Sequence, residues 1–485
     1  MANIEALRPF QEEDLPFFAK VKKSLMLYEP RMGKTVETCK IIAEDPECNV
    51  ILIACSKNAL STWLDHLETW FKHINPTYSI EIRLVRGKNS AAAATRKGIW
   101  NTPRKADVTV YLVTYAALIN DSKNASIPKW LIFDTVIADE FHRALQNRNN
   151  KSSELFRHLV RRAKRFHPLS GTSVGKLGPA DLWCVLNMCN PVEFSSYWTF
   201  VQRYCWVVEG VFGMEITGVK DPVNWKLTLH RYARVRDRAT HAPQMPKVQR
   251  DLLWVSMDTG QNKFYSQMEK DQVTITPDGK LHVAINSLEE FVRKRQILTC
   301  PAILDPSLGM GAAFEDLVEK MEEAREDKDE SGYHIAIFTA YKKAIEPWKR
   351  YLEEKGFPVQ LLHGGLEPED LNLRIATFRQ NKGVIICTTK FAQAFSLTPA
   401  IQCFHIGWEF NPNENKQAED RLVPQQGDFN INSWYYAYNN TEDVFYADRV
   451  TQRAEFIHRT LGNTTEQAEA ILEDYHNNNQ DGIPY

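Results

Sequence analysis

The sequence has no excess of charge of one sign and no long hydrophobic run. Its 485 residues include 59 lysines and arginines and 61 aspartates and glutamates, which leaves a net charge of −2. A chain that is nearly neutral as a whole can attract a polyanion only through a local basic surface. No stretch approaches the roughly eighteen apolar residues of a membrane span, and the first residues lack the basic-then-apolar pattern of a signal peptide. We therefore expect a soluble, cytoplasmic protein.

Repeated cysteine pairs are also absent. The nine cysteines contain no repeated Cys-x-x-Cys, which argues against a zinc site and against a disulfide framework. Cys184 and Cys387 lie in apolar runs, as buried thiols do. The hydrophobic fraction of 43% and the charged fraction of 25% are those of an ordinary globular protein. A chain of this length is too long for one core, so two or three domains are expected.

Short apolar runs alternate with amphipathic stretches in the first part of the chain, up to about residue 200. Buried strands are predicted at Leu25–Leu27, Val50–Ala54, Val108–Val113 and Leu131–Ala138. Helices are predicted at Val36–Ala43 and Ala59–Lys72. Strands that alternate with helices favour a parallel sheet covered on both faces.

The same alternation returns in the last part of the chain and predicts a second α/β lobe. Strands are predicted at His334–Phe338, Val359–Leu362, Gly383–Cys387 and Cys403–Ile406, with helices at Ala344–Lys355 and Leu371–Gln380. The segments between the lobes are longer and more charged, and the Pro277-Asp278-Gly279 turn predicts a hairpin there. We expect a first lobe at residues 1–206, a mainly helical connector at 207–318, and a second lobe with a C-terminal helix and tail at 319–485.

A phosphate-binding loop is indicated where the first predicted strand meets the first predicted helix. Such a loop needs backbone N–H groups that face the anion, a helix N-terminus, a lysine, and a hydroxyl for magnesium. Gly33, Lys34 and Thr35 supply the closing glycine, the lysine and the hydroxyl. The opening glycine of the general pattern is absent, and Tyr28 stands in its place.

Two adjacent carboxylates, Asp139 and Glu140, follow the apolar run Val136–Ala138. Charged side chains at the end of a buried strand are costly unless they serve a purpose. ATP hydrolysis requires one carboxylate that holds magnesium and one that orients the attacking water. The alternative, an acidic pair that faces solvent, is weakened by the phosphate-loop pattern upstream.

The order of further motifs resembles the Swi/Snf branch of the superfamily-two helicases, and the resemblance covers most of the chain. Asp139-Glu140-Phe141-His142 resembles motif II, with Phe141 where alanine is usual. Other similar segments are Leu7–Gln11 (the adenine-reading motif), Leu169–Ser173 (motif III), Asp181–Asn187, Arg295–Leu304 (the connector typical of this branch), Phe338–Tyr341 (motif IV), His363–Gly365, Cys387–Ala400 (motif V) and Gln417–Arg421 (motif VI).

Two positions depart from the family's pattern. Motif V has Phe391–Phe395 where glycines are usual, so a bulkier loop is expected. Motif VI normally has a second arginine three residues after the first, and counting from Arg421 that place holds Pro424. An arginine that reaches the γ-phosphate contributes orders of magnitude in rate. The sequence leaves open whether Arg421 acts alone or whether another arginine, such as Arg449, substitutes.

The resemblance implies two RecA-like lobes with parallel sheets, joined by a helical Swi/Snf-type connector, that bind ATP and Mg²⁺. The implied catalytic residues are Lys34, Asp139, Glu140 and Arg421, and the implied metal ligands are Thr35 and Asp139. The implied nucleotide-binding residues are Arg8, Gln11, Met32, Gly33, Lys34 and Thr35.

The resemblance also implies a DNA partner, which can be duplex, forked or branched. The candidate DNA contacts are Ser56, Lys57, Thr114, Tyr115, Thr339, Lys342, His363, Thr388 and Lys390. Hydroxyls and lysines suit contact with phosphate that is independent of base sequence. For Tyr115 and Tyr341 the alternative is packing within a lobe, and for His363 the alternative is a hydrogen bond within a local turn. The basic run Arg157–Arg165 has a spacing that spreads around a helix, which favours a solvated surface for most of its residues; contact with DNA phosphate is the alternative.

The favoured function is ATP-driven movement along DNA in replication, recombination or repair. Three alternatives stay open: an ATP-sensing DNA clamp with weak turnover, an unwinding or branch-migrating helicase, and the motor subunit of a nuclease complex. A partner protein from replication, recombination or a nuclease complex is possible. The chain is short for this family, which favours a bacterial or phage protein.

Overall fold

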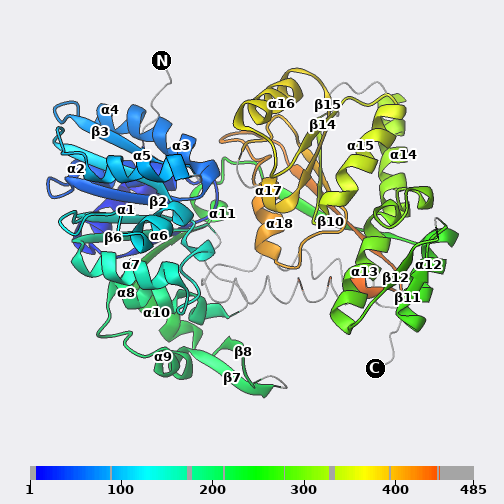
Figure 1. Cartoon of the computed structure of the whole chain (residues 1–485), viewed down its shortest axis with the longest axis horizontal. Helices are drawn as coiled ribbons and strands as arrows, with labels where there is room; N and C mark the ends of the chain where they lie inside the picture. Colours follow the sequence, from blue (N-terminus) through cyan, green and yellow to red (C-terminus); the bar gives the residue numbers. More distant parts are fainter. Residues whose placement is uncertain are drawn as a thin grey trace. The chain divides into compact units, whose positions relative to one another are not determined.

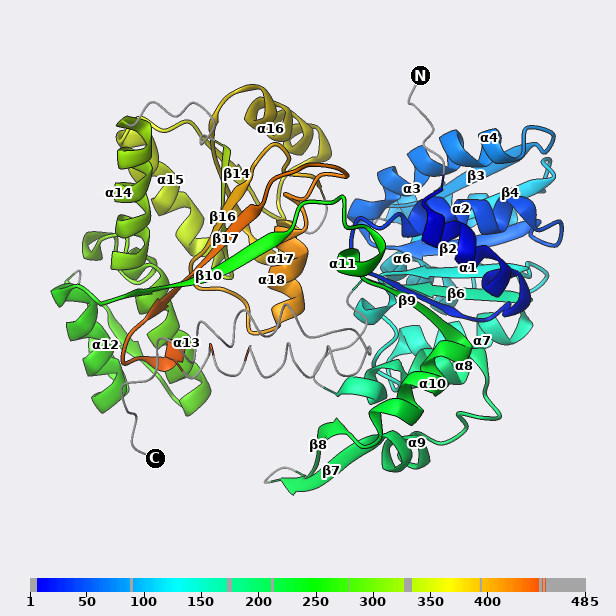
Figure 2. The ribbon, with the colours of Figure 1, turned by 180° about the vertical axis from the view of Figure 1, so that it is seen from behind.

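The computed structural model describes residues 7–87, 90–171, 177–210, 213–277, 279–326, 334–392, 395–444, 447 and 450. These residues form two compact units, which divide between Pro243 and Gln244. The unit that ends at Pro243 is called the first lobe, and the unit that begins at Gln244 is called the second lobe. Figures 1 and 2 show the elements of both from opposite sides.

In the described residues of the first lobe, seven parallel strands form one sheet in the order β3-β4-β2-β5-β6-β1-β9. The strands are β1 (Leu25–Tyr28), β2 (Val50–Cys55), β3 (Ile80–Val85), β4 (Val108–Thr114), β5 (Thr135–Asp139), β6 (Arg165–Leu169) and β9 (Ala233–Arg236). Every residue of β1 and β2 is buried. This pattern is expected for parallel strands that are covered on both faces.

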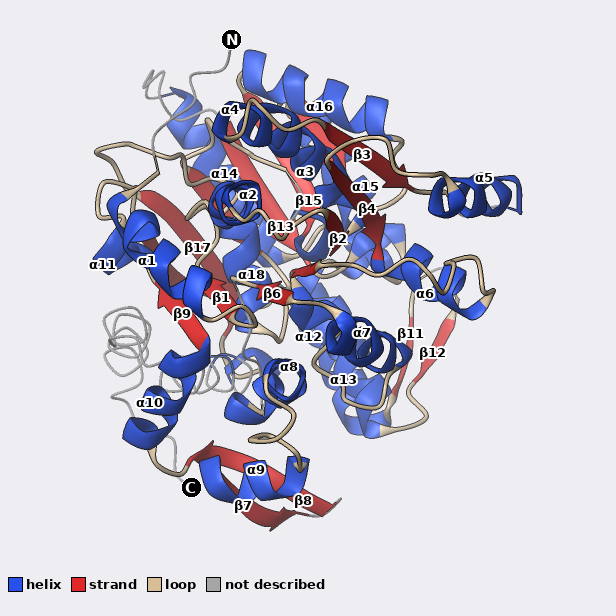
Figure 3. Ribbon diagram, turned by 90° about the vertical axis from the view of Figure 1, so that its left-hand side faces the viewer, coloured by secondary structure: helices blue, strands red, loops and turns tan. Residues whose placement is uncertain are grey.

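Helices cover both faces of this sheet because the chain changes direction along it (Figures 1 and 3). From β1 to β2 to β3 the chain moves toward one edge, and from β3 through β4, β5 and β6 it moves back. Right-handed crossovers place the helices of these two stretches on opposite faces. One face carries α2 (Lys34–Glu44), α3 (Leu60–His66) and α4 (Lys72–Ile74), and α1 (Pro9–Lys20) packs against α2. The other face carries α5 (Ser90–Asn101), α6 (Tyr115–Lys123) and α7 (Lys151–Arg162), and α8 (Trp183–Cys189) packs against α7.

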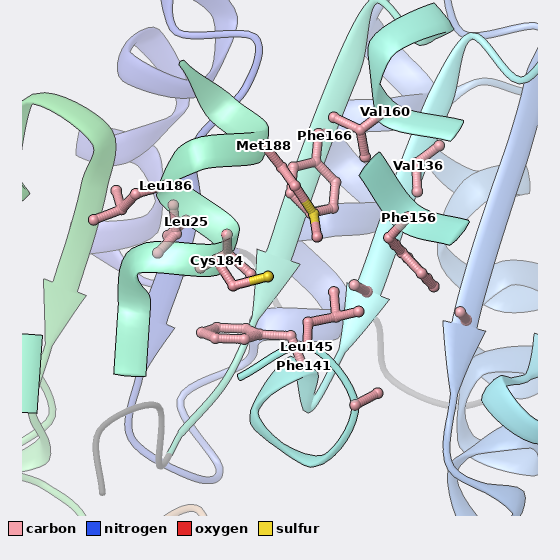
Figure 4. Close-up of a cluster of buried hydrophobic side chains, with 14 of the residues drawn as sticks. Leu25, Val136, Phe141, Leu145, Phe156, Val160, Phe166, Cys184, Leu186 and Met188 are labelled. Carbon is pink, nitrogen blue, oxygen red and sulfur yellow. The ribbon is translucent and has the colours of Figure 1, made fainter. Parts of the chain in front are cut away.

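The core on the α7 and α8 side is shown in Figure 4. Leu25, Val136 and Phe166 project from β1, β5 and β6, the three strands whose ends carry the predicted motifs I, II and III. Side chains of the two helices close over them: Phe156, Val160, Cys184, Leu186 and Met188. This packing fixes the three strand ends relative to one another.

In the second lobe, six parallel strands of the described residues follow the order β10-β17-β16-β13-β15-β14. They are β10 (Val248–Val255), β13 (His334–Thr339), β14 (Val359–Leu362), β15 (Gly383–Thr388), β16 (Gln402–His405) and β17 (Ile431–Tyr438). The helices are α12 (Thr259–Asp271), α13 (Ser287–Thr299), α14 (Ala312–Glu326), α15 (Ile345–Glu354), α16 (Pro368–Gln380), α17 (Thr389–Ala392) and α18 (Pro412–Glu419). The predicted hairpin is present, as β11 (Val273–Ile275) and β12 (Leu281–Val283).

The expected connector at 207–318 is not a unit of its own. Its first part belongs to the first lobe, where β9 pairs with β1, and its last part belongs to the second lobe, where β10 pairs with β17. This segment also contains an antiparallel hairpin, which is formed by β7 (Cys205–Gly210) and β8 (Gly213–Val219). The helices of its first part are α10 (Pro222–Tyr232) and α11 (Arg238–His241), after α9 (Tyr197–Tyr204). Strands β9 and β10 contain charged residues such as Arg236 and Asp251, so they do not form continuous apolar runs in the sequence.

Part of the basic run was also placed wrongly. Helix α7 ends at Arg162, and Arg165 opens the buried strand β6. The Arg165 guanidinium pairs with Asp45 and donates to the carbonyl oxygen of Phe18. Arg165 is therefore a structural residue of the first lobe and not part of a solvated helix surface. None of the helices in the described residues is long and apolar enough to cross a membrane.

Candidate functional site

Three neighbouring strands bring the predicted motifs I, II and III of the first lobe together. Strands β5, β6 and β1 are adjacent and parallel, so their carboxyl ends meet at one edge of the sheet. Lys34 follows β1, Glu140 follows β5 and Ser170 follows β6. Asp139 at the end of β5 is the register partner of Leu169 at the end of β6. Such an edge is where ligands bind in open α/β sheets.

The phosphate loop after β1 is held by the side chain of Gln11. Its Nε2 donates to the carbonyl oxygens of Gly33 (3.1 Å) and Met32 (3.4 Å), and its Oε1 accepts from the backbone N–H of Arg8 (2.8 Å). Gly33 has a φ of +81°, and a Cβ there would lie 2.7 Å from Gln11 Nε2. Two features therefore require glycine at this position: the backbone conformation and the close approach of the Gln11 side chain. Arg31 also has a positive φ of 66°, which costs about 1–2 kcal/mol for a residue with a side chain.

Lys34 and Thr35 begin helix α2, directly after this loop. The Lys34 ammonium reaches back to the end of β1, where it donates to the carbonyl oxygens of Tyr28 (2.9 Å) and Glu29 (3.4 Å). Thr35 is half-buried in the first turn of α2. The N-terminus of a helix, with a lysine and a hydroxyl beside it, is suited to bind a phosphate chain.

The Asp139 carboxylate is oriented by a residue that the sequence analysis did not single out. The indole Nε1 of Trp63 donates to Asp139 Oδ2 over 2.8 Å, and the Tyr115 hydroxyl donates to the Asp139 carbonyl oxygen over 2.8 Å. Burial and the neighbouring charge of Glu140 raise the pKa of Asp139 to about 6, whereas the bond from Trp63 and the charge of Lys34 lower it. The sequence marks Trp63 as a helix residue of the core, and it gives no signal of this bond.

Glu140 lies in a triangle with His142 and Ser170. The Glu140 Oε2 atom is 3.3 Å from His142 Nδ1 and 3.5 Å from Ser170 Oγ, and the last two atoms share a hydrogen bond of 2.8 Å. Burial lowers the pKa of His142 to about 4, so its imidazole is neutral at pH 7. A Cβ on Gly171 would lie 2.9 Å from Cδ of Pro30. The loop after β6 therefore contacts both the Glu140 segment and the phosphate loop. Thr172 and Ser173 of this motif lie outside the described residues.

The donor set of the site fits Mg²⁺. In the part of the chain that the structure describes, no group of three or more His, Cys, Asp or Glu side chains could hold a metal ion. Mg²⁺ prefers oxygen ligands and usually keeps several waters, with one or two carboxylates and the substrate phosphates as its other ligands. The Thr35 hydroxyl and the Asp139 carboxylate are ligands of this kind, so they would hold the ion with a bound nucleotide.

The candidate DNA contacts of the first lobe lie at the ends of two other adjacent strands. Ser56 and the exposed Lys57 follow β2, and Thr114 ends β4. The Thr114 hydroxyl accepts the backbone N–H of Ala117 and thus caps α6. The Tyr115 hydroxyl is bonded to motif II, as described above, and its ring lies 5.7 Å from that of Phe156. These contacts favour the packing alternative for Tyr115.

The candidate DNA contacts of the second lobe gather at one edge of its sheet. Thr339 and Thr388 are register partners at the ends of β13 and β15, and His363 follows the next strand, β14. Lys342 and Lys390 are exposed. Lys390 lies 3.3 Å from a carboxylate oxygen of Glu409 and 3.5 Å from one of Glu414, so its charge is partly balanced. Tyr341 packs against the core of the lobe, whereas His363 Nδ1 has no hydrogen-bond partner among the described residues.

Motif VI is anchored by a buried ion pair that the sequence analysis missed. Glu419, at the end of α18, accepts hydrogen bonds from Arg250 of β10 and from Ser433 and Tyr435 of β17. Burial opposes the charge of Glu419, but Arg250, His405 and Tyr435 together outweigh it and lower the pKa of this carboxyl to about 2. The Arg421 carbonyl oxygen accepts from the backbone N–H of Leu397 over 2.7 Å. The backbone that carries Arg421 is thus fixed within the second lobe, while Arg449 lies outside the described residues.

Removing the indole hydrogen bond to Asp139 should weaken metal binding. We expect Trp63→Phe to raise the Mg²⁺ concentration that gives half-maximal ATPase activity by about tenfold, because a partner that orients a metal ligand typically contributes that much. The measurement is a Mg²⁺ titration of ATPase rate. Trp348→Phe in the second lobe is the matched control, because its indole is equally buried and donates to the Met310 carbonyl oxygen. Equal Mg²⁺ curves for the Trp63→Phe variant and the wild type would contradict the assignment.

Comparison with known proteins agrees with this arrangement. The family model of the SNF2-related domain matches residues 10–304, and that of the helicase conserved C-terminal domain matches residues 313–423. The first match ends at Leu304, the last residue of the connector-like segment, and the second ends one residue before Pro424.

Individual relatives are distant and longer. The chain is 22% identical over 440 residues to the zebrafish (Danio rerio) chromodomain-helicase-DNA-binding protein 1-like, which covers 86% of this chain and 40% of the relative. It is 20% identical over 460 residues to the Xenopus tropicalis SWI/SNF-related matrix-associated actin-dependent regulator of chromatin subfamily A-like protein 1, which covers 93% of this chain and 44% of the relative. The chain thus spans about two fifths of the length of these relatives.

Among solved structures, the SWI2/SNF2 ATPase core of Sulfolobus solfataricus in complex with dsDNA is 17% identical, with a TM-score of 0.40; the match covers 95% of this chain and 98% of that one. The SNF2-related model alone accounts for more than half of the sequence. The chain belongs to the SNF2-related family, and its two lobes are the helicase-like ATPase domains of that family.

Proposed function

We propose that this chain is a DNA-dependent ATPase that uses ATP hydrolysis to move along double-stranded or branched DNA, in replication, recombination or repair. The observation that carries the ATPase is the meeting of Lys34 after β1 with Asp139 and Glu140 at the end of β5, on the two sides of β6 in one sheet. The names of the relatives support DNA as the partner: one is a chromodomain-helicase-DNA-binding protein, and another, from cow (Bos taurus), is a DNA annealing helicase and endonuclease.

Each residue of the site has a distinct part in the proposed reaction. Lys34 and the first N–H groups of α2 bind the phosphates. Thr35 and Asp139 hold Mg²⁺, which neutralises phosphate charge when it is bound. Glu140 positions the attacking water and is itself held by His142 and Ser170. Arg421 of the second lobe stabilises the charge that develops on the transferred phosphate.

The contact with DNA is proposed to be made by polar strand ends of both lobes. Ser56, Lys57 and Thr114 would serve in the first lobe, and Thr339, Lys342, His363, Thr388 and Lys390 in the second. Hydroxyl and ammonium groups bind phosphate oxygens without reading the bases. The motor would therefore track along the backbone with little sequence preference.

The test of this function is a comparison of nucleic-acid ligands. ATPase rates are measured without nucleic acid and then with single-stranded DNA, duplex DNA, forked DNA and RNA. The proposal requires duplex or forked DNA to stimulate most. Stimulation by RNA, with DNA inert, would reject DNA as the partner.

The affinity for DNA is expected to fall steeply with salt. Neutralisation of Z phosphates gives a slope of roughly −0.9Z in a plot of log affinity against log salt. We therefore expect Lys342→Ala to reduce the slope by about one and to weaken binding equally for unrelated sequences. Lys349→Ala, on helix α15 of the same lobe, is the control. An unchanged slope for Lys342→Ala would remove this lysine from the DNA contacts.

A second candidate function is an ATP-sensing DNA clamp with weak turnover. The observation that favours it is Pro424, at the place of the second motif VI arginine. Such a clamp would bind ATP and DNA but would hydrolyse ATP slowly even with the preferred DNA. The name of the bovine relative contains the word endonuclease. A motor that works as a subunit of a nuclease complex is therefore a further variant of the first proposal.

A further inference from the structure

Two large aromatic side chains are exposed where α9 meets the β7–β8 hairpin of the first lobe. Trp198 lies in the first turn of α9 and is 52% exposed, and Trp206 lies in β7 and is 55% exposed. Helix α9 and the hairpin lie together in Figures 1 and 3, apart from β2 and β4, whose ends carry the candidate DNA contacts of this lobe. Tryptophans are highly buried on average, so two exposed rings on one short segment indicate a surface that binds a partner.

A positive side chain lies beside each of these rings. The Arg148 guanidinium lies 3.7 Å from the ring centroid of Tyr197 and 5.7 Å from that of Trp198. The Lys220 ammonium lies 5.4 Å from the ring centroid of Trp206. These distances are those of cation–π contacts, which hold the positive groups next to the aromatic faces.

The cations of this region are not neutralised by acidic side chains. In the part of the chain that the structure describes, Arg148, Arg203 and Lys220 form no ion pair with a carboxylate. Arg203 is exposed near the C-terminal end of α9, and Lys220 is exposed directly after β8. The surface therefore has three positive groups whose charge an anionic ligand can balance.

The acidic side chains nearby limit the surface on one side only. Glu193 pairs with Arg231, and Asp221 caps the N-terminus of α10. Glu209 and Glu215 are exposed, but they lie farther along the hairpin than the exposed tryptophan of β7. An anionic ligand would therefore follow α9 and the base of the hairpin and avoid its far end.

Aromatic faces with positive groups beside them fit the bases and phosphates of a single strand. Bases stack on aromatic side chains when they are not paired in a duplex, and the phosphates of the same strand bind the neighbouring cations. Helix α9 has eight residues and is about 12 Å long, which matches about three nucleotides at roughly 3.4 Å each. An apolar protein surface would cover the rings but would leave the three cations without anionic partners. The charges therefore favour a nucleic acid.

The surface in question, called the α9 surface, consists of Arg148, Tyr197, Trp198, Arg203, Trp206 and Lys220. We propose that the α9 surface binds single-stranded DNA, with bases stacked on the two tryptophans and phosphates bound by the three cations. This site goes beyond the proposed function, because the candidate contacts at the strand ends suit phosphates of any DNA, whereas stacking requires an unpaired strand. On a forked or branched DNA it would hold the unpaired arm.

The binding test needs no ATP. A fluorescein-labelled oligothymidylate of about 16 nucleotides is titrated with the full chain, and Kd is measured by fluorescence anisotropy. We expect Trp198→Ala and Trp206→Ala each to raise Kd by about tenfold, which is within the range for loss of one stacked base. Trp198→Phe keeps an aromatic ring and should raise Kd by less than about threefold. Trp130→Ala is the matched control, because Trp130 is a similarly exposed tryptophan (59%) of the first lobe and should leave Kd unchanged.

A blunt duplex of the same length separates this site from general DNA binding. Its bases are paired, so Trp198→Ala and Trp206→Ala should leave its Kd unchanged. Losses as large for the duplex as for the single strand would overturn the proposal. Unchanged Kd values for oligothymidylate in both variants would also overturn it and would leave the surface to a protein partner.

Salt dependence tests the cations. Arg203→Ala should reduce the slope of log affinity for oligothymidylate against log salt by about 0.7, the value for one phosphate of a single strand. Lys97→Ala, an exposed lysine of α5, is the control and should leave the slope unchanged. An equal slope for Arg203→Ala and the wild type would remove this arginine from the site.

A crosslinking experiment decides the proposal if a tryptophan variant does not fold. An oligonucleotide that contains bromodeoxyuridine is irradiated with the wild-type chain, and the crosslinked peptides are identified by mass spectrometry. Crosslinks to Trp198 or Trp206 are expected, and crosslinks confined to other segments would overturn the proposal. If no DNA stimulates ATP hydrolysis, the proposed function fails, while the Kd for oligothymidylate still decides whether the α9 surface binds a single strand.

Discussion

Lys34→Ala and Glu140→Gln are each expected to abolish nucleic-acid-stimulated ATP hydrolysis. The Lys34 ammonium reaches from the start of α2 to the end of β1, and its loss removes the charge that binds the phosphate chain. Glu140→Gln keeps the size of the side chain but removes the carboxylate that positions the water. Since electrostatic stabilisation is often the largest part of catalysis, losses of several orders of magnitude are expected. The measurement is the steady-state ATPase rate with saturating DNA.

The two variants should differ in nucleotide binding. Glu140→Gln retains Lys34, Thr35 and the loop held by Gln11, so it should bind ATP about as well as the wild type does. Lys34→Ala should bind ATP weakly. Lys40→Ala is the control, because Lys40 lies on the same helix and pairs with Glu44 near the surface. If Lys34→Ala or Glu140→Gln kept more than about a tenth of normal turnover, the site assignment would be wrong.

The fold could be predicted where strands are continuous apolar runs. The runs in β2, β4, β13, β14 and β15 are of this kind, and the structure places strands at each of them. Strand β6 was not predicted, because it contains His167 and Pro168, and a proline is rare within a central strand. Strands β9 and β10 carry arginines whose charges are balanced by distant partners, Asp14 and Glu419. Pairing between segments so far apart in the sequence leaves no local pattern.

The residues of the site that react or bind could be predicted from the sequence, but the residues that hold them in place could not. Lys34, Thr35, Asp139 and Glu140 are required by the chemistry of phosphate and water, so residue type and spacing are enough to identify them. The residues that hold them are chosen by packing. The bond from Trp63 to Asp139 and the contacts of Ser170 with Glu140 and His142 depend on which strands are neighbours, and strand order was not available from the sequence.

The second large effect is expected for substitution of Arg421, which lies three residues before Pro424. We expect Arg421→Ala to lower DNA-stimulated turnover as severely as Lys34→Ala does, and Pro424→Arg to change it by less than about twofold. The reason is that the first lobe keeps every residue that hydrolysis needs, and those residues would have little use in a protein that does not hydrolyse ATP. The anchoring of motif VI by Arg250 and Glu419 also gives the Arg421 backbone a fixed place in its lobe. Arg350→Ala, an exposed arginine of α15, is the control for loss of a positive charge.

The opposite result has a clear meaning. If the second arginine is simply lost, the wild-type rate should be low with every DNA, and Pro424→Arg should raise it by about tenfold or more, because an arginine at the γ-phosphate typically contributes 10³-fold or more when it is well placed. That outcome would favour the clamp. Unfolding temperatures of both variants are needed beside the rates, since Pro424 is half-buried and an arginine there has to find room. A rate that falls in Pro424→Arg together with the unfolding temperature would report a folding defect, and Arg421→Ala then decides between the motor and the clamp by itself.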